Sequence, residues 1–440
     1  MGKLCNIETA EHIQHKAVWP GEHPHEQFRQ LCREAGRIAD DAWRFPAKQD
    51  QRCAGAIRLT LSSISTKWEQ NWKLAAMNRE ETKPACLDFF AGSGLVAEGL
   101  KGFFQTVWAN DICEKKAKVF CANHDRKIFH LGSIQDVKGA DLPPALLSWG
   151  SFPCQDLSLA GNMGGLSSSR SGLVWQWLRV MDELPNRPAL AVAENVVGLV
   201  SAAKGEHYQK LHNALVERGY QVGAVVIDAV HWVPQSRKRV FVIAVDSAIP
   251  TGQFETDHPL WCHPDAIIRA AEKLNGWVWW NLPKPPESKK KIDEVIELST
   301  PCDQPEKQQR LLQLVPEKHR EKMIIAAKKG QAVFPGYKRI RHGQQVLELR
   351  FDGVAGCLRT PEGGSSRQFL VMNDNGSFKT RLLTVNEAAA LMGAPKNYKL
   401  PGTYNDGYKA MGDAVAVPVT RYLAEYLLVP LAELIKERGV

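Results

Sequence analysis

Short apolar runs alternate with helical patterns over the stretch from residue 85 to residue 245. Helical segments are predicted between most of the runs, for example at residues 115–123 and 206–218. Such alternation is typical of an α/β protein whose sheet is covered by helices on both faces. The predicted strands are residues 85–90, 106–109, 146–149, 189–193, 221–229 and 239–245.

The rest of the chain does not show this alternation. Residues 1–83 carry mixed charge with scattered Trp, Leu and Ile and are predicted to form an N-terminal helical extension before the α/β domain at 84–249. Residues 250–375 contain Pro-rich and Gly-rich turns, so we expect a second, smaller and less regular domain there. Residues 376–440 end in an amphipathic helix, about 418–438, which is apolar enough to pack back on the sheet.

Composition excludes several classes of protein. The chain has 440 residues, of which 44% are hydrophobic and 24% charged, so it forms a core and is not disordered as a whole. No stretch approaches the roughly 18 apolar residues that span a bilayer, and the start lacks the apolar run of a signal peptide, so we expect a cytoplasmic protein. The ten cysteines form no Cys-x-x-Cys pair, so neither a metal site nor a secreted disulfide framework is predicted.

The positive charge of the chain is concentrated in one segment. Residues 284–350 hold 15 Lys and Arg against 9 Asp and Glu, an excess of six within a total net charge of +8. Lys and Arg clusters suit phosphate groups, although a solvated surface has the same composition. The segment is therefore consistent with a polyanionic partner without requiring one.

The first candidate site is a glycine turn that follows the first predicted strand. The sequence Asp88-Phe-Phe-Ala-Gly-Ser-Gly94 allows a tight turn and the close approach of a ligand, and Asp111 ends the next strand about 20 residues on, where a carboxylate can bind a ribose. A plain tight turn would need the same glycines. The strand before the turn and Asp111 after it favour a cofactor that contains adenosine, and the absence of a third glycine disfavours a pyrophosphate.

Three further segments lie at the ends of predicted strands. Cys154 stands in the glycine-rich and polar loop 150–158, where ligands bind in open α/β sheets, although most loop cysteines are inert. Glu194 ends a hydrophobic strand and could be kept protonated by burial, or could simply begin a helix. Residues 235–239, Gln-Ser-Arg-Lys-Arg, form a basic triplet suited to phosphates and bases, or an ordinary charged entry to a strand.

In this order, these segments resemble the motifs of the DNA cytosine-carbon-5 methyltransferases. The resemblance rests on Asp88-Phe-Phe-Ala-Gly-Ser-Gly, Gly150-Ser-Phe-Pro-Cys-Gln, Glu194-Asn-Val and Gln235-Ser-Arg-Lys-Arg, and is completed by Arg381-Leu-Leu-Thr-Val-Asn-Glu and Gly412-Asp-Ala-Val-Ala-Val-Pro-Val. It covers about half the chain, residues 84–246 and 367–427. It implies an S-adenosylmethionine-dependent, Rossmann-like methyltransferase sheet with a target-recognition domain at 250–375.

The resemblance also implies catalytic roles. Cys154 would be the nucleophile that adds to carbon 6 of a cytosine, because a thiolate attacks strongly and leaves again. Glu194 would hold ring nitrogen 3 and the exocyclic amine as charge develops. Arg237 and Arg239 would contact the nucleotide and its phosphate, and the base must be flipped out of the duplex to be reached.

The cofactor implied by the resemblance is S-adenosylmethionine. The sequence departs from the family pattern at two of the expected contacts: Ser133 stands where an acid usually faces the adenine amine, and Asp413 replaces the usual Asn after a glycine. These departures bear on cofactor affinity more than on the reacting atoms. The cofactor-binding residues expected are Phe90, Ala91, Gly92, Ser93, Gly94, Asp111, Ile112, Ser133, Ile134, Pro153, Asp413, Ala414 and Val415.

The partner implied by the resemblance is double-stranded DNA. The basic segment falls within the region that this family uses for target recognition, which favours a DNA contact over a solvated surface there. A monomer is expected, with a role in restriction-modification or phage defence. The DNA-binding residues expected are Gln155, Ser158, Gln235, Gly363, Gly364, Ser365, Ser366 and Arg367.

Other functions compete with this hypothesis. A tRNA cytosine-5 methyltransferase would share the motifs, and a non-catalytic regulator that binds S-adenosylmethionine and DNA would share the fold but would be expected to lack Cys154 or Glu194. A nicotinamide-dependent oxidoreductase would use the glycine turn but would leave the Pro-Cys-Gln and Gln-Ser-Arg-Lys-Arg segments unexplained.

Overall fold

The computed structural model describes residues 83–153, 172–360 and 367–438. The chain divides into two compact units, Met1–Thr82 and Lys83–Val440, and all the described residues belong to the second. The predicted N-terminal extension thus lies outside the described residues, whereas the predicted α/β region lies almost entirely within them.

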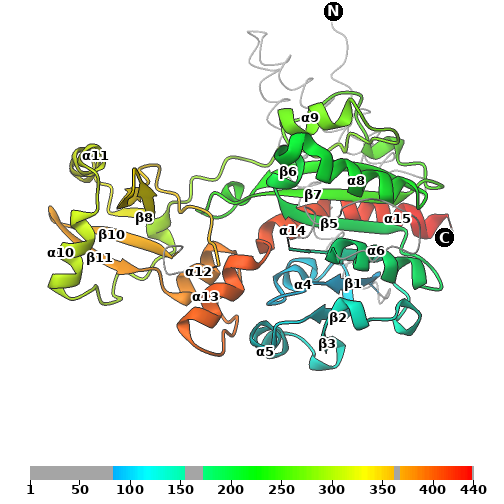
Figure 1. The fold of residues 1–440 in the computed structure, drawn as a ribbon, viewed down its shortest axis with the longest axis horizontal. Coiled ribbons are helices and arrows are strands. Elements are labelled where there is room, and N and C mark those ends of the chain that lie inside the picture. The colour runs from blue at the N-terminus through cyan, green and yellow to red at the C-terminus, as the bar shows by residue number, and fades with distance from the viewer. Residues whose placement is uncertain (1–82, 154–171, 361–366, 439–440) are drawn as a thin grey trace, which may run out of the picture. The chain divides into compact units, whose positions relative to one another are not determined.

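The second unit contains a seven-stranded sheet with the order β3-β2-β1-β4-β5-β7-β6 (Figure 1). Strands β1 to β5 run parallel, whereas β7 lies antiparallel between β5 and β6. All six predicted strands are present, and the short β3 is an additional one. The bounds are β1 Ala85–Phe89, β2 Gln105–Asp111, β3 Phe129–Leu131, β4 Leu147–Gly150, β5 Leu190–Val196, β6 Tyr220–Asp228 and β7 Lys238–Asp246.

Both faces of this sheet are buried, which explains why its strands are almost continuously apolar. Successive side chains of a strand point to opposite faces. On β7, Phe241 and Ile243 join one core cluster, while Val240 and Val242 join the other. This two-sided burial confirms the predicted α/β class with helices on both faces.

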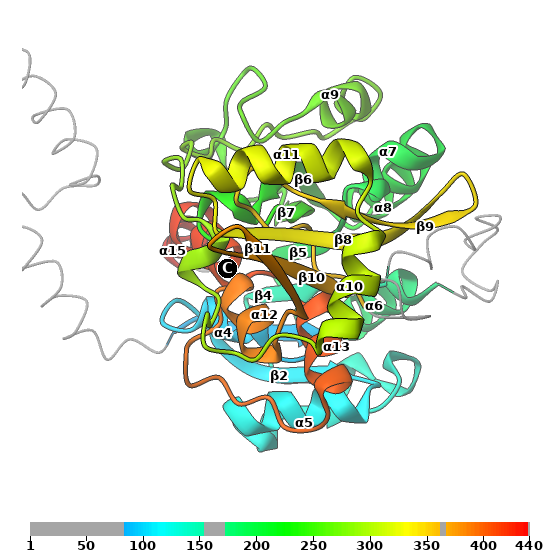
Figure 2. The same ribbon diagram turned by 90° about the vertical axis from the view of Figure 1, so that its left-hand side faces the viewer.

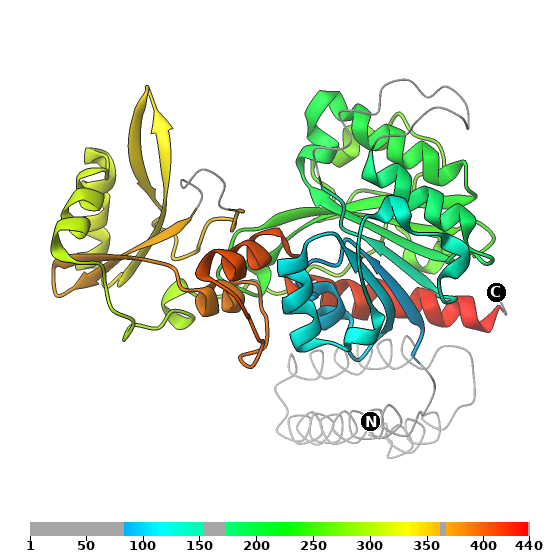
Figure 3. The ribbon, with the colours of Figure 1, turned by 60° about the horizontal axis from the view of Figure 1, so that its bottom comes forward.

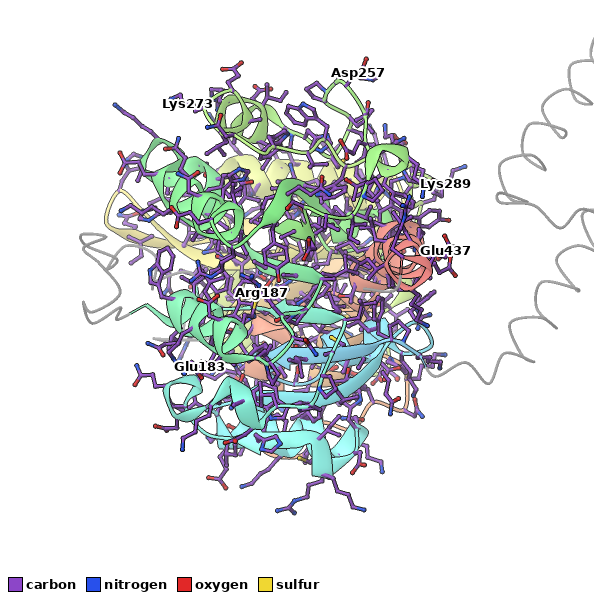
Figure 4. All side chains as sticks on the ribbon, turned by 90° about the vertical axis from the view of Figure 1, so that its right-hand side faces the viewer. Glu183, Arg187, Asp257, Lys273, Lys289 and Glu437 are labelled. Atoms are coloured by element: carbon purple, nitrogen blue, oxygen red, sulfur yellow. The ribbon has the colours of Figure 1, made fainter. Side chains whose placement is uncertain are left out.

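Different helices supply the two cores. Buried residues of α6 (Leu173–Glu183), α8 (Glu206–Val216) and α9 (Asp265–Ala271) belong to one cluster, whereas those of α4 (Leu95–Leu100) join the other with the C-terminal helices. The helix α5 (Glu114–Asn123) follows β2 and packs beside β3 (Figure 1). Charged side chains at and just after the C-terminal ends of α6 and α9 are exposed, as Figure 4 shows for Glu183, Arg187 and Lys273.

The C-terminal helix packs against the core of the large sheet. It runs through α14 (Val417–Leu423), a π-helical turn at Ala424–Leu428 and α15 (Val429–Glu437), and it lies along the first strands in Figure 3. Together with α13 (Tyr404–Asp413) it forms one run, Tyr404–Glu437, that is long and apolar enough to cross a membrane. Within that run 61% of the apolar window is buried inside the protein, and its leucines are part of the large core cluster. These contacts are those of a core helix.

The region after β7 is more regular than its sequence indicated. Four strands from residues 333–349 and 368–382 form an antiparallel sheet in the order β11-β10-β8-β9. The helices α10 (Pro305–Gln313) and α11 (Glu317–Lys328) cover it, and α11 lies across the sheet in Figure 2. The apolar faces of these strands alternate with charged positions, so no continuous apolar run marks them in the sequence. The strands are β8 Val333–Arg341, β9 Gln344–Leu349, β10 Gln368–Asp374 and β11 Ser377–Leu382.

Candidate active site

The expected site residues meet at one edge of the large sheet. Strands β2, β1, β4 and β5 are parallel neighbours, so their carboxyl ends lie together. Phe89 pairs with both Asn110 and Gly150, and Val196 pairs with Arg239 at the start of β7. The chain leaves β1 towards β2 on one side and returns to β4 on the other, so this edge is the topological switch point where open α/β sheets bind ligands.

The glycine turn adopts a left-handed backbone conformation at three positions. Gly92 and Gly94 have φ values of 56° and 84°, and Phe90 has φ 57° although it is not a glycine. Non-glycine residues rarely occupy this region, and they concentrate at ligand-binding sites. At Gly94 a Cβ atom would also come within 2.6 Å of the His124 ring, so only glycine fits there.

Asp111 holds the turn against β2. Its Oδ2 atom accepts a hydrogen bond of 3.0 Å from the amide of Gly92, and its Oδ1 atom accepts one of 2.8 Å from the amide of Cys113. The carboxylate is buried, whereas the neighbouring Ile112 is 72% exposed. An apolar side chain left open beside a glycine turn suits the flat face of a ligand ring.

Asp88 is a buried acid to which the sequence pattern assigns no role. It is the fourth residue of β1, is fully buried, and neither of its carboxylate oxygens has a hydrogen-bond partner among the described residues. Burial raises the pKa of Asp88 well above its usual value, and the nearby Asp111 raises it further. A buried carboxyl group without a partner requires an explanation, and a ligand or water at the glycine turn would supply one.

The third strand contributes structural contacts at this edge. The Ser133 hydroxyl accepts a hydrogen bond of 3.2 Å from the amide of Gln135 and caps a short 3-10 turn. Ile134 is buried in the core, and its carbonyl accepts a bond of 3.0 Å from the Arg179 guanidinium on α6. Ser133 therefore stands just after the third strand, with its hydroxyl used locally.

Glu194 and Arg239 form an ion pair at the other end of the edge. The Nε atom of Arg239 lies 3.1 Å from Oε1 of Glu194, and Glu194 is only 6% exposed. Burial raises the pKa of Glu194, although Arg239, Arg237 and a hydrogen bond with Ser151 act in the opposite direction. The site thus holds an acid whose proton affinity is raised, next to a cation, as general acid assistance requires.

The loop that leads towards Cys154 is tied to the same edge. The Asn195 side chain donates to the carbonyl of Phe152 at 2.9 Å, the amide of Ser151 donates to the carbonyl of Phe89 at 3.2 Å, and the Trp149 indole donates to the Ser151 hydroxyl at 3.0 Å. Pro153, the last described residue of this loop, is exposed. Cys154, Gln155 and Ser158 lie outside the described residues.

Arg237 occupies a different environment from Arg239 and corrects one expectation. It is 1% exposed, and its guanidinium donates to the carbonyls of Leu358 at 2.9 Å, Gly412 at 2.9 Å and Ala414 at 2.6 Å. Burial lowers the pKa of Arg237 to about 10. Arg237 therefore joins the large sheet to two later segments of the chain, in place of the expected contact with a nucleotide.

Gln235 is corrected in the same way. It is fully buried, its amide nitrogen donates to the carbonyl of Leu391 at 2.7 Å, and its amide oxygen accepts from the amide of Leu358 at 2.9 Å. Both polar ends are thus satisfied within the protein, so the side chain is not available for the expected contact with DNA. Periodicity could not reveal this, because the partners are more than 120 residues away in the sequence.

The C-terminal segment contacts the same region. Asp413 forms an ion pair of 2.7 Å with Lys116 on α5 and accepts a hydrogen bond from the hydroxyl of Thr360. Ala414 is half-buried. Val415 is buried in the core, so the Val415 side chain does not line an open site. Arg367 donates to Asn405 at 2.6 Å and stacks over Tyr404, while residues 363–366 lie outside the described residues.

Cys357 is a functional candidate that sequence reasoning missed. Its Sγ atom lies 3.4 Å from an Nη1 donor of Arg237 and 3.8 Å from Nη1 of Arg239. Burial raises the pKa of Cys357, but the two arginines outweigh burial and leave it below its usual value. The sequence around Cys357 does not predict these arginine neighbours, because Arg237 lies 120 residues earlier in the chain.

Comparison with known proteins identifies the family. A sequence profile described as C-5 cytosine-specific DNA methylase matches residues 85–428. The chain belongs to this family. It is therefore a DNA (cytosine-5-)-methyltransferase that uses S-adenosylmethionine, and the resemblance of the motifs to this family is confirmed.

Several relatives support the assignment. The type II methyltransferase M1.ScrFI of Lactococcus lactis subsp. cremoris is 25% identical over 358 residues, which cover 80% of this chain and 79% of the relative. The type II methyltransferase M.HhaI of Haemophilus parahaemolyticus is 26% identical over 77% of this chain and 92% of its own length. Over a shorter stretch, 39% of this chain, M.MthTI of Methanothermobacter thermautotrophicus is 34% identical.

Solved structures show the same fold at lower identity. The S. pombe Dnmt2 methyltransferase aligns with a TM-score of 0.52 at 18% identity, over 80% of this chain and 99% of that one. A DNMT2 variant of Spodoptera frugiperda aligns with a TM-score of 0.51 at 18% identity, over 78% and 99%. These likenesses confirm the predicted methyltransferase sheet.

The geometry of the glycine turn fits the cofactor of this methyltransferase. A Cβ atom at Gly92 would meet its neighbours no closer than 3.9 Å, which is ordinary van der Waals contact, so the turn is not tightly packed at this position. The unpartnered carboxyl group of Asp88 and the carboxylate of Asp111 suit a ligand that carries positive charge and hydroxyl groups. No group of three or more His, Cys, Asp and Glu that could hold a metal occurs among the described residues.

Proposed function

We propose that this methyltransferase modifies carbon 5 of a specific cytosine in double-stranded DNA through a covalent bond between Cys154 and carbon 6 of a flipped base. One observation carries the proposal: the buried Glu194–Arg239 pair lies at the edge to which the loop before Cys154 is tied. Cys154 directly follows Pro153, which is the last described residue of that loop. The proposed nucleophile and the acid therefore come from neighbouring strands, β4 and β5.

Glu194 would assist the attack by binding ring nitrogen 3. The Cys154 sulfur forms a bond to carbon 6, and the electron pair of the 5,6 double bond moves towards nitrogen 3, where the Glu194 carboxyl group supplies a proton or a hydrogen bond. Arg239 holds the Glu194 carboxyl group in place, because its Nε atom lies 3.1 Å away. Preorganised groups of this kind are worth more in a buried site than in water.

Methyl transfer and elimination complete the proposed reaction. S-adenosylmethionine, which the glycine turn and Asp111 would hold, would supply a methyl group on a positively charged sulfur. Carbon 5, made electron-rich by the addition of Cys154, would take that methyl group as the bond to sulfur breaks. Loss of the carbon-5 proton to a base then restores the double bond and expels the Cys154 thiolate, so that the enzyme is regenerated.

Positively charged residues of the region that holds the second sheet would contact the DNA backbone. Lys318, Arg320 and Lys322 are exposed on α11, and Lys338 and Arg339 are half-buried on β8. Exposed Lys and Arg side chains bind phosphates and release counterions, which makes binding salt-dependent. We assign the target-recognition function to residues 250–375, with the expected contacts at Gly363, Gly364, Ser365 and Ser366 among them.

The biological setting is also part of the proposal. The relatives M1.ScrFI and M.HhaI are named type II methyltransferases, which favours a restriction-modification or phage-defence role in the cytoplasm. A monomer that encloses one flipped base would suffice for the reaction.

A methyl-transfer assay would test the substrate. Purified enzyme would be incubated with tritiated S-adenosylmethionine and either duplex DNA of mixed sequence or tRNA. We expect label in the DNA and none above background in the tRNA. Label in tRNA alone would make the chain an RNA methyltransferase and contradict the proposal.

The covalent step has its own test. Wild-type enzyme should form a complex that survives denaturing electrophoresis with a duplex containing 5-fluorocytosine, because fluorine at carbon 5 cannot be lost as a proton. Cys154→Ser should abolish both this complex and methyl transfer. Cys302→Ser, at a half-buried cysteine before α10, is the matched control and should retain both. A complex that persisted in Cys154→Ser would exclude this thiol as the nucleophile.

A further inference from the structure

Two lysines on α5 form ion pairs with two aspartates on α13, and only one pair lies at the glycine turn. Lys115 pairs with Asp406 at 2.7 Å, and Lys116 pairs with Asp413 at 2.7 Å. The Lys115 side chain is 67% exposed, whereas that of Lys116 is 22% exposed. The helices α5 and α13 lie side by side in Figures 1 and 2. The Lys115–Asp406 ion pair, whose lysine is exposed, can therefore serve as a control for the Lys116–Asp413 ion pair at the site.

The Lys116 side chain extends from the turn to Asp413. Its Cδ atom lies 3.9 Å from where a Cβ atom of Gly92 would stand, and its Nζ atom reaches the Asp413 carboxylate. Asp413 also accepts a hydrogen bond from the hydroxyl of Thr360. The end of α13 is held at the turn by a second contact, in which the Ser93 hydroxyl donates to the carbonyl of Ala410 at 3.1 Å.

The backbone around Asp413 is fixed from both sides. At Gly412 a Cβ atom would come within 2.8 Å of the Arg359 backbone, so this segment approaches the chain before Thr360 as closely as glycine allows. Arg237 binds the carbonyls of Gly412 and Ala414. The backbone of Asp413 is therefore held next to the turn.

The electrostatics of the turn explain why the Lys116 pair matters. Asp88, Asp111 and Asp413 place three carboxyl groups around the turn, which suits the positively charged sulfur and amine of S-adenosylmethionine. The same cofactor ends in a carboxylate, which an unpaired Asp413 would repel. Like charges repel more strongly in a partly buried site than in water. Burial lowers the pKa of Lys116, but Asp413 and Asp111 outweigh burial and raise it, so the cation persists at neutral pH.

We propose that Lys116 is a positioning residue of the cofactor site, which neutralises Asp413 so that the carboxylate end of S-adenosylmethionine can bind at the glycine turn. The inference rests on the cofactor position proposed above, and goes beyond it by assigning a residue outside the family motifs identified in the sequence. It also explains how this chain tolerates Asp413 where the family usually has Asn: the extra negative charge is matched by a lysine.

Binding measurements with single and double variants test the proposal. Affinities for S-adenosylmethionine, S-adenosylhomocysteine and 5′-methylthioadenosine, which lacks the amino-acid end, would be measured by calorimetry on the full chain without DNA. Lys116→Ala should weaken binding of the first two ligands about tenfold, or about 1.4 kcal/mol, and leave 5′-methylthioadenosine within about twofold. Lys116→Arg should bind like the wild type. Lys115→Ala, the matched control, should change no affinity.

The decisive comparison is the double variant. Removing the charge of Asp413 should make Lys116 dispensable, so Lys116→Ala with Asp413→Asn should recover most of the lost affinity. Asp413→Asn alone should bind S-adenosylmethionine at least as tightly as the wild type, because the Lys116 cation is then left unpaired. The proposal would be overturned if the affinity losses of the two substitutions were additive, or if Lys115→Ala lost as much affinity as Lys116→Ala. It would also be overturned if Lys116→Ala lost as much affinity for 5′-methylthioadenosine as for the other two ligands. Thermal unfolding without ligand would show whether any loss reflects stability instead.

A further variant separates this inference from the cofactor position. Asp111→Asn should weaken the binding of all three ligands, because each contains the ribose that Asp111 is proposed to hold. If wild type binds S-adenosylmethionine but Asp111→Asn does not weaken it, the cofactor position is wrong. If Asp111→Asn weakens binding and the Lys116 cycle shows no recovery, only the role of Lys116 is wrong.

Discussion

The two ends of the site edge use different chemistry to satisfy their polar groups. At the β1–β2 end, the glycine turn is held by backbone amides that donate to Asp111, and the positive φ values of Phe90, Gly92 and Gly94 shape it. At the β5–β7 end, charged side chains make the contacts, as in the Glu194–Arg239 pair. The cofactor end should therefore be sensitive to steric changes and the base end to changes of charge.

The largest effect is expected from Glu194. Glu194→Gln keeps the shape of the side chain but removes the charge paired with Arg239 and the proton that assists attack. Removal of one preorganised group of this kind costs about 10²–10³ in kcat, and we expect a loss of that size. Single-turnover methylation of a duplex substrate would measure it, with S-adenosylmethionine binding as the control that should not change. Wild-type turnover in the Glu194→Gln enzyme would remove this carboxyl group from the mechanism.

The pH dependence sharpens the same point. Because burial raises the pKa of Glu194, its protonated form persists above the usual range of a glutamate, and activity should fall as pH rises through that pKa. Arg239 lowers the pKa, so Arg239→Met should move this fall to higher pH. The folded-state pKa is raised, so Glu194 also costs stability progressively as pH rises from its unfolded pKa to its folded pKa. Rate profiles of the two enzymes, measured at saturating cofactor, would show the shift or its absence.

The two arginines of the Gln-Ser-Arg-Lys-Arg segment provide the next contrast. Arg237→Met would leave the carbonyls of Leu358, Gly412 and Ala414 without their donor, and should lower the free energy of unfolding by about 3 kcal/mol. Arg239→Met should lower activity with a smaller change in stability, because its side chain is 14% exposed at the site and Glu194 can take up a proton. Denaturant unfolding and turnover would be measured for both. Equal stability losses would show that Arg239 is as structural as Arg237.

A pair of glycines tests the steric argument at the cofactor end. Gly94→Ala must adopt φ 84° and meet His124, whereas Gly102→Ala must adopt φ 99° with no atom within 4 Å. The control should therefore cost about 1 kcal/mol of stability, which is the contribution of the backbone alone. Gly94→Ala should cost about 2 kcal/mol and also weaken S-adenosylmethionine binding. If the two substitutions had the same cost, the contact with His124 would not restrict the turn.

The smallest effect concerns thiol reactivity. Cys357 lies beside Arg237 and Arg239, which lower its pKa, whereas burial raises the pKa of Cys262 to about 12. Because the thiolate is the reactive form, Cys357 should react with iodoacetamide faster than Cys262 at pH 7. Peptide mass spectrometry after timed labelling would give both rates. Faster labelling of Cys262 would contradict this ordering of the two thiols.

Much of the fold could be predicted because strand signals in the large sheet are local. Each strand of a doubly covered sheet is apolar over its own length, so the runs at residues 85–90 and 239–245 identify β1 and β7 without reference to other segments. The strands of the second sheet have charged positions such as Lys338 and Lys379 between their apolar ones. These strands are stabilised by pairing with one another, and the pattern within each strand does not show which segments pair. They were therefore not predicted.

The same distinction separates the site residues. Glu194 and Asp111 could be assigned from their places at strand ends, because parallel strands bring their carboxyl ends to one edge. The buried positions of Gln235 and Arg237 could not be, since their partners at Leu358, Leu391 and Gly412 come from segments that fold over the start of β7. A basic motif gives the charge of a segment but not the direction in which each side chain points.

The sequence by itself determined the class of the protein, the order of its motifs and the chemistry that they carry, because residue type and strand pattern are local properties. Only the tertiary structure decided which charges are available to a substrate. Arg239 forms an ion pair with Glu194 at the site, whereas Arg237, two residues earlier, donates hydrogen bonds to backbone carbonyls. Lys116 forms an ion pair with Asp413, which is nearly 300 residues away in the sequence. Burial and pairing depend on which distant segments pack together, and no local pattern encodes that.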